Sequence, residues 1–242
     1  MKGVVLAGGL GTRLSPLTTI TNKHLLPVYN KPMIYYPIQS LVDAGVEEVI
    51  VVTGGNSSGD FLRLLKNGKH FGLKRLNYAY QEGEGGIADA LSYAEEFCEN
   101  EAMCVILGDN IIENNIIEFV SAFNRKPKGS RILLKEVPDP ERFGVPVFEN
   151  ERIVRIEEKP KKPKSQYAVI GIYIFDNSVF GRIGGLSPSA RGELEVTDLI
   201  NMYIAENTLE WSVLEGWWSD AGTFESLLKA SNLVAQTGAN KK

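Results

Sequence analysis

The chain has 242 residues, of which 43% are hydrophobic and 23% are charged, and its formal net charge is −4. This composition is typical of a globular protein with a sizeable core. It carries no Lys/Arg block, which argues against nucleic acid as a partner. No apolar run approaches the roughly 20 residues that span a bilayer, so we expect no membrane partner.

The N-terminal residues enter a strand pattern directly, without the features of a signal peptide, and we expect a cytoplasmic protein. The sequence has two cysteines, Cys98 and Cys104. Both lie in apolar stretches and are too few for a disulfide framework or a zinc site, so we predict two reduced, buried thiols.

Short apolar runs in the first half of the chain predict buried strands separated by helices. The predicted strands are 2–7, 46–53, 76–80 and 103–107, and the predicted helices are 32–44 and 87–97. Strands that alternate with helices in this way indicate parallel βαβ units with both faces of the sheet covered.

The rhythm changes after about residue 128. Four strands follow with few helices between them, at 132–137, 145–148, 153–157 and 169–175, and helical patterns return at 196–206 and 223–235. This order predicts a mixed or antiparallel extension of the same sheet. The fold class is therefore α/β, with one compact domain over residues 1–242 and no linker or repeat.

Glycines or an acid follow three of the predicted parallel strands, and a glutamine follows the fourth. Gly8 and Gly9 follow the first, Gly54 the second and Asp109 a later one, while Gln81 follows 76–80. Ligands of parallel sheets bind beyond the carboxyl ends of the strands. We therefore expect these residues to converge on one site.

The segment 6–13 is a glycine-rich loop that directly follows a strand. Glycines let backbone N–H groups approach phosphate oxygens, and Arg13 and Lys23 add cations. A dinucleotide fingerprint would need glycine at Leu14, and a P-loop would need Gly-Lys-Ser/Thr. Neither is present, so the loop indicates phosphate binding of another type or a tight glycine turn.

Several blocks now point to a known family. Residues 6–18 and 22–27 resemble the signature of sugar-1-phosphate nucleotidylyltransferases. The blocks at 107–110, 143–145, 157–160, 189–198 and 218–223 are similar to those of glucose-1-phosphate thymidylyltransferases and occur in the same order. The resemblance covers residues 1 to about 235 and implies a Rossmann-like α/β/α sandwich with a mixed, mostly parallel sheet.

The resemblance implies a nucleotide-binding part over about 1–128 and a sugar-phosphate-binding part over about 129–235. The implied nucleotide-binding residues lie in the glycine loop and at Gln81 and Gly86, which match positions that read the pyrimidine base. The implied sugar-phosphate-binding residues follow later in the chain. The first set comprises Leu6, Ala7, Gly8, Gly9, Gly11, Thr12, Arg13, Gln81 and Gly86, and the second comprises Asn110, Gly144, Glu158, Lys159, Val169 and Trp218. Lys23 matches a lysine that contacts the phosphates.

The resemblance also implies that Asp109 and Asp220 hold one Mg²⁺ between them. The implied substrates are dTTP and glucose 1-phosphate, and the implied product is a dTDP-sugar for pathways such as dTDP-rhamnose synthesis. Magnesium typically takes one or two carboxylates together with substrate phosphates. The catalytic set is then Arg13, Lys23, Asp109, Lys159 and Asp220, with no general base because the attacking phosphate is already ionised.

Each of these assignments has a structural alternative. Asp109 could form a turn after its strand, Asp220 could cap the helix that starts near Thr223, and Lys159 could be a solvated loop residue. Trp217 and Trp218 could pack in the core or line the site. Glu193, Glu195 and Asp198 could contact the sugar or cap a helix.

The segment 81–87 departs from the family pattern because it lacks the prolines of longer thymidylyltransferases. A UTP-dependent or other sugar-1-phosphate nucleotidylyltransferase is therefore the alternative, ahead of a non-catalytic nucleotide-sugar sensor. The chain ends short of the extra C-terminal helices of those longer enzymes, so we expect weak or differently built feedback control. The resemblance further implies a homo-oligomer.

Overall fold

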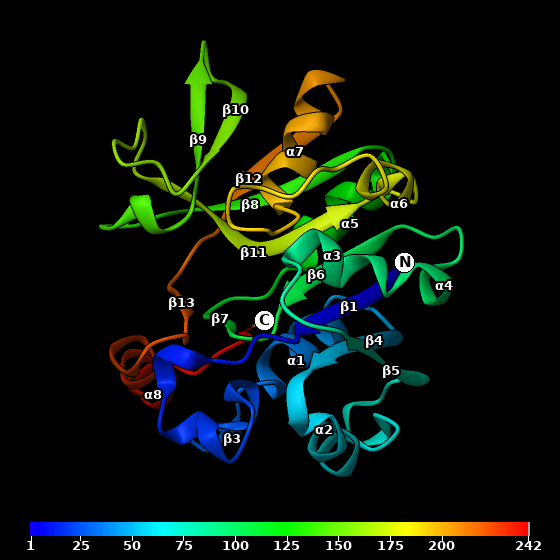
Figure 1. The fold of residues 1–242 in the computed structure, drawn as a ribbon, viewed down its shortest axis with the longest axis vertical. Helices are drawn as coiled ribbons and strands as arrows, with labels where there is room; N and C mark the ends of the chain where they lie inside the picture. The colour runs from blue at the N-terminus through cyan, green and yellow to red at the C-terminus, as the bar shows by residue number, and fades with distance from the viewer. Residues whose placement is uncertain (242) are drawn as a thin grey trace.

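The computed structural model describes residues 1–241, and its centre is one nine-stranded mixed sheet (Figure 1). The main path of the sheet runs β10-β9-β11-β6-β1-β4-β5, and β8 and β12 extend it beside β11. The strands are β1 (Lys2–Ala7), β4 (Glu48–Gly54), β5 (Arg75–Gln81), β6 (Met103–Leu107), β8 (Ser130–Glu136), β9 (Gly144–Glu149), β10 (Arg152–Glu158), β11 (Tyr167–Phe175) and β12 (Leu209–Val213).

The first half of the chain builds the parallel part of this sheet. β1 lies between β4 and β6, and β5 pairs with β4, all in parallel register. β1 and β4 are buried along almost their whole length, which explains why they read as continuous apolar runs in the sequence.

The second half of the chain adds antiparallel strands to the same sheet. β11 pairs antiparallel with β6 and with β8, and β9 and β10 form a hairpin at the far end. Figure 1 shows this hairpin projecting from the upper part of the molecule, above β11. The predicted mixed sheet is confirmed.

Helices cover both faces of the sheet. The helices are α1 (Tyr35–Asp43), α2 (Ser58–Leu65), α3 (Ile87–Ser92), α4 (Glu95–Cys98), α5 (Ile117–Arg125), α6 (Val179–Ile183), α7 (Val196–Ala205) and α8 (Phe224–Thr237). Apolar residues of α1, α2 and α5 pack in one core cluster, and those of α3, α4, α6 and α7 pack in the other. Alternate residues of β1 enter the two clusters, as the period of a strand requires. This arrangement is the predicted three-layer α/β/α sandwich.

Two small sheets lie outside the large one. β2 (Pro27–Val28) pairs with β3 (Lys31–Pro32), and β7 (Asn110–Ile112) pairs antiparallel with β13 (Trp218–Asp220). The second pairing sets Asp220 opposite Asn110. This pairing brings β13, from late in the chain, next to the residues that follow β6.

The structure also corrects the sequence analysis in detail. The helix predicted over 87–97 is two short helices, α3 and α4, separated at Tyr93 and Ala94. The helices α2, α5 and α6 and the short strands β7, β12 and β13 were not predicted. Cys98 and Cys104 are free and buried, as predicted. Within residues 1–241, no helix combines the length and apolar character needed to cross a membrane.

Candidate active site

The carboxyl ends of the parallel strands meet as predicted. Gly8 follows β1, Gly54 ends β4, Gln81 ends β5 and Asp109 follows β6. A Cβ atom on Gly54 would lie 2.8 Å from the carbonyl oxygen of Gly8, and one on Gly8 would lie 2.5 Å from Oε1 of Gln81. Glycine at both positions therefore allows the loops after β1, β4 and β5 to approach one another closely.

The glycine loop is shaped around Lys23. Gly11 has a φ of 68°, and a Cβ atom there would lie 2.8 Å from Cβ of Lys23. Lys23 opens a short 3-10 turn that is capped by the side chain of Asn22, which accepts a hydrogen bond from the backbone N–H of His24 at 2.9 Å. The glycine loop and Lys23 therefore pack against each other as one unit.

Two hollows adjoin at Asp109. The first has a volume of about 310 Å³ and lies over the glycine loop, and the second has a volume of about 450 Å³ and lies between the parallel strands and the β9–β10 hairpin. We call them the loop pocket and the hairpin pocket. The pockets share four lining residues, namely Ile87, Leu107, Asp109 and Glu193. Two ligands bound side by side would therefore meet at Asp109.

Most of the predicted site residues line one of these pockets. The loop pocket contains Leu6, Gly8, Gly9, Lys23, Gln81, Gly86 and Asp109, and the hairpin pocket contains Arg13, Asp109, Asn110, Gly144, Glu158, Lys159, Val169, Trp218 and Asp220. Three predicted residues line neither. Ala7 is fully buried, Gly11 supports Lys23, and Thr12 lines a separate hollow near Ser15 and Thr18.

Asp109 is held as a charged carboxylate. Its Oδ2 accepts from Nζ of Lys23 at 2.5 Å, and its Oδ1 accepts from Nδ2 of Asn110 at 3.0 Å. Burial raises the pKa of Asp109, but the Lys23 ammonium and these hydrogen bonds outweigh burial and hold the pKa well below its usual range. Asp109 therefore carries a negative charge at neutral pH.

Asp220 lines the hairpin pocket together with Asp109 and lies opposite Asn110 in the β13–β7 pairing. Burial and the negative charge of Asp109 raise the pKa of Asp220 to about 6, against the opposing charges of Arg142 and Arg13. Nη2 of Arg142 lies 3.3 Å from Oδ2 of Asp220. The helix after it is capped instead by Thr223, whose Oγ1 accepts from the backbone N–H of Ser226 at 3.2 Å. The structure therefore gives the capping role to Thr223.

The two carboxylates fit a cation that completes its shell with ligand oxygens. Among residues 1–241, no group of three or more His, Cys, Asp or Glu side chains is placed to hold a metal ion. Asp109 and Asp220 are close enough for the charge of one to raise the pKa of the other. One buried and one half-buried carboxylate suit Mg²⁺, which commonly binds one or two carboxylates and substrate phosphates, better than they suit a metal held wholly by protein.

Asn110 is fixed by its neighbours and joins both halves of the chain. Its Oδ1 accepts from Nε1 of Trp218 at 2.7 Å and from the backbone N–H of Gly171 at 3.0 Å. The ring of Trp218 packs edge-on against Phe143 at the hairpin pocket. Trp218 is therefore a wall of the pocket, whereas Trp217 donates to Thr237 outside it.

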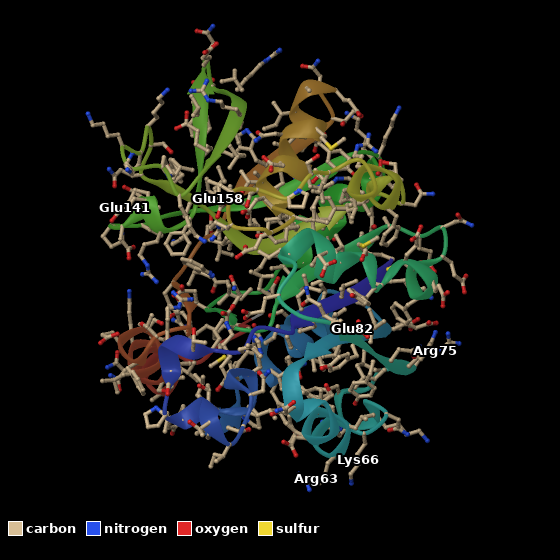
Figure 2. All side chains as sticks on the ribbon, in the orientation of Figure 1. Arg63, Lys66, Arg75, Glu82, Glu141 and Glu158 are labelled. Atoms are coloured by element: carbon tan, nitrogen blue, oxygen red, sulfur yellow. The ribbon has the colours of Figure 1, made fainter. Side chains whose placement is uncertain are left out.

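Charged side chains crowd the far end of the hairpin pocket. Glu158 ends β10, where Figure 2 shows it at the base of the β9–β10 hairpin, and its carboxylate accepts from Thr197. Nη2 of Arg191 lies 2.8 Å from Oε2 of Glu195 and 3.5 Å from Oε1 of Glu158. Lys159 directly follows Glu158 and has a φ of 43°. Its Nζ lies 3.4 Å from Oε1 of Glu158. This end of the pocket pairs cations with acceptor oxygens, which suits a polyhydroxy ligand that carries a phosphate.

The sequence analysis did not single out two arginines of this pocket. Arg142 precedes the block 143–145, and Arg191 lies within the block 189–198. The blocks were a usable signal, but nothing in the sequence distinguished these arginines from surface cations. Glu193 and Glu195 also line the hairpin pocket, whereas Asp198 is exposed on α7 outside both pockets.

The sequence is similar to known nucleotidyltransferases along almost its whole length. The family model described as "Nucleotidyl transferase" matches residues 2–237. The glucose-1-phosphate thymidylyltransferase of Neisseria meningitidis is 44% identical over 238 residues, which are 97% of this chain and 82% of that protein. The low-salt glycan biosynthesis nucleotidyltransferase of Haloferax volcanii is 36% identical over all of this chain and 68% of its own length.

Solved structures of nucleotidyltransferases share the fold of this chain. A Bacillus anthracis protein provisionally named glucose-1-phosphate thymidylyltransferase, crystallised in complex with a sucrose, matches with a TM-score of 0.93 and 47% identity over 98% of this chain and 96% of that one. A UDP-glucose pyrophosphorylase complexed with UDP-glucose matches with a TM-score of 0.84 and 25% identity over 97% and 98%. With the family model spanning nearly the whole sequence, this chain belongs to the nucleotidyl transferase family.

Proposed function

We propose that this protein transfers a thymidylyl group from dTTP to glucose 1-phosphate and releases pyrophosphate. The observation that carries the proposal is the pair of adjoining pockets that meet at Asp109. One pocket has a glycine loop with Lys23, and the other has sugar-type acceptors with Lys159 and Arg191. Relatives called glucose-1-phosphate thymidylyltransferase, which are 38–46% identical over 96–97% of this chain, support the choice of dTTP and glucose 1-phosphate.

In the proposed reaction, a phosphate oxygen of glucose 1-phosphate attacks the α-phosphorus of dTTP. The bond from the α-phosphorus to the bridging oxygen breaks, and pyrophosphate leaves with its electron pair. No proton has to move, because the attacking phosphate is ionised near neutral pH. Catalysis of this kind depends on positioning and on charge stabilisation.

Each group of the site then has a defined task. Lys159 and Arg191 lie where they would hold the sugar phosphate, and Glu158 would accept hydrogen bonds from sugar hydroxyls. Arg13 would stabilise the charge that grows on pyrophosphate. Asp109 and Asp220 would hold Mg²⁺, which when bound offsets the repulsion between the two phosphates.

The alternative of a UTP-dependent enzyme keeps the same chemistry and changes only the base. The similarity to a UDP-glucose pyrophosphorylase complexed with UDP-glucose favours it as the second candidate. Both candidates place the nucleotide in the loop pocket and the sugar phosphate in the hairpin pocket. They differ only in the contacts made with the base near Gln81.

A substrate matrix tests the proposal. Purified protein is incubated with Mg²⁺ and each of dTTP, UTP, CTP, ATP and GTP, against glucose, galactose and N-acetylglucosamine 1-phosphates, and pyrophosphate is measured. We expect the highest kcat/KM for dTTP with glucose 1-phosphate. Preference for UTP would select the second candidate. Binding of nucleotide and sugar phosphate without pyrophosphate release in any combination would contradict the proposed activity.

A further inference from the structure

The side-chain amide of Gln81 is held by two hydrogen-bond acceptors. Its Nε2 donates to Oδ2 of Asp89 at 2.8 Å and to the carbonyl oxygen of Gly86 at 3.3 Å. A carboxylate and a carbonyl can only accept, so the NH₂ group of the amide must face them. The chemistry of these partners fixes which end of the amide is nitrogen.

The opposite end of the amide is open to the loop pocket. Oε1 of Gln81 lies against Gly8, where a Cβ atom would come within 2.5 Å of it. Within residues 1–241 no group donates a hydrogen bond to this oxygen. The oxygen is also not completely enclosed by protein. Gln81 itself is 5% exposed and lines the loop pocket. It therefore presents an unused acceptor to the ligand and no free donor.

We propose that Asp89 is a positioning residue for base selection, because it holds the acceptor end of Gln81 toward the nucleobase. This inference rests on the proposed function, in which the base is thymine or uracil. These bases carry an N3–H donor that matches the oxygen of Gln81. A reversed amide would set its NH₂ group against that N3–H, donor against donor. Cytosine, in contrast, has a lone pair at N3 and would accept from a reversed amide.

A purely structural role for Asp89 has to be separated from this one. Asp89 lies in the first turn of α3, where any carboxylate stabilises a helix. A loss of helix stability would weaken the whole site and change all kinetic constants together. A positioning role acts through Gln81 alone and changes only the constants that depend on the base.

The experiment compares four single variants and one double variant in the pyrophosphate assay. Asp89→Ala removes the acceptor, and Asp89→Asn keeps a carbonyl oxygen that can accept from Gln81. Ser92→Ala is the matched control, because it removes a hydrogen bond to the backbone of Asp89 without contacting Gln81. Gln81→Ala, alone and combined with Asp89→Ala, completes a double-mutant cycle.

We expect Asp89→Ala to raise KM for dTTP about tenfold, the size of one lost hydrogen bond, with kcat and KM for glucose 1-phosphate within about twofold. The preference for dTTP over CTP should fall by a similar factor. Asp89→Asn and Ser92→Ala should stay within about threefold of the parent protein, and Asp89→Ala should add less than about twofold in the Gln81→Ala background.

Three outcomes would overturn the inference, and they distinguish its failure from the failure of the proposed function. If the parent protein turns over dTTP and Asp89→Ala keeps the same ratio of dTTP to CTP, Asp89 has no role in base selection, although the proposed function stands. Asp89 also has no specific role in base selection if Asp89→Ala changes both KM values and kcat by the same factor, both in the parent protein and in the Gln81→Ala variant. If the parent protein releases pyrophosphate with none of the nucleotides, the proposed function fails and the inference fails with it.

Discussion

Asp109 takes part in two interactions that both depend on its negative charge. It pairs with Lys23 at 2.5 Å, and its charge acts on Asp220 in the hairpin pocket. Replacing a carboxylate by an amide keeps the size of the side chain and removes its charge. The substitution therefore tests the charge of Asp109 rather than its volume.

Asp109→Asn should lower kcat at least about a thousandfold, the scale seen when one electrostatic contact of a transition state is lost. Pyrophosphate release measures the effect, and a circular dichroism spectrum establishes that the variant is folded. Asp198→Asn is the matched control, because that carboxylate is exposed outside both pockets. An active, folded Asp109→Asn protein would contradict the assignment of Asp109 to the metal.

His24 makes a separate prediction at the same scale, about stability rather than activity. Its side chain is 2% exposed, and its Nδ1 lies 2.7 Å from Oδ1 of Asn22. Burial and the neighbouring Lys23 charge lower the pKa of His24 to about 3, from 6.5 in an unfolded chain. Between these values the unfolded state binds the extra proton, so the folded state loses stability as the pH falls below 6.5.

The contribution of His24 to the free energy of unfolding should therefore fall by about 2 kcal/mol between pH 7.5 and pH 5. Urea unfolding of the parent protein and of His24→Gln at both pH values measures it. Subtracting the two pH dependences removes the carboxylates, which titrate in both proteins. Equal pH dependence in the parent and the variant would show that His24 is not held neutral.

At the scale of elements, α8 anchors the strand that carries Asp220. Thr223 and Ser226 form a reciprocal capping box at its first turn, and Ala230 and Val234 pack against Val28 and Met33 in a third core cluster. The helix is thereby fixed directly after β13. Its cap stabilises both the helix and the short strand before it.

Thr223→Ala should lower the free energy of unfolding by about 1 kcal/mol, the usual cost of losing an N-cap side chain. Thermal unfolding should show this as a decrease in Tm of about 2–4 °C for a chain of this size. Lys229→Ala, at an exposed position of the same helix, is the control and should leave Tm unchanged. A Thr223→Ala protein as stable as the control would indicate that the cap contributes nothing.

At the scale of the whole molecule, we propose that residues 1–241 are one folding unit. The edge of β6 that faces away from β1 is covered by β11, with Ile172 opposite Ile106 and Tyr173 opposite Val105. The N-terminal half of the chain therefore depends on a strand from the C-terminal half. The fragment 1–128 would expose that edge and part of the apolar surface of β6 to water.

A protein cut to residues 1–128 should consequently lack a cooperative thermal transition, whereas the full chain should unfold in one. Differential scanning calorimetry of both measures this directly. Co-expression of 1–128 with 129–242 is the complementary experiment, and it should restore folding if β11 can pair in trans. Cooperative unfolding of the fragment alone would show that the first half is an autonomous domain.

The local patterns of the sequence determined the class of fold and much of the loop pocket. β1, β4 and β6 are continuous apolar runs because each is an inner strand of the sheet and is buried along most of its length, and such runs are visible in a sequence. Gly8, Gly54, Gln81 and Asp109 converge because parallel strands place their carboxyl ends at one edge. The break between α3 and α4 was not visible, because apolar residues keep helical spacing across it.

The tertiary structure alone decided how the second pocket is assembled. Asp220 reaches Asp109 because β13 pairs with β7 and sets Asp220 opposite Asn110. That pairing joins segments more than a hundred residues apart through three-residue strands, which carry no periodic signal of their own. The amide orientation of Gln81 likewise depends on Asp89, a contact made by folding α3 back over the end of β5. The sequence determines the residue types and the local pattern of strands and helices. Contacts between side chains that are distant in the sequence form only when the strands have paired.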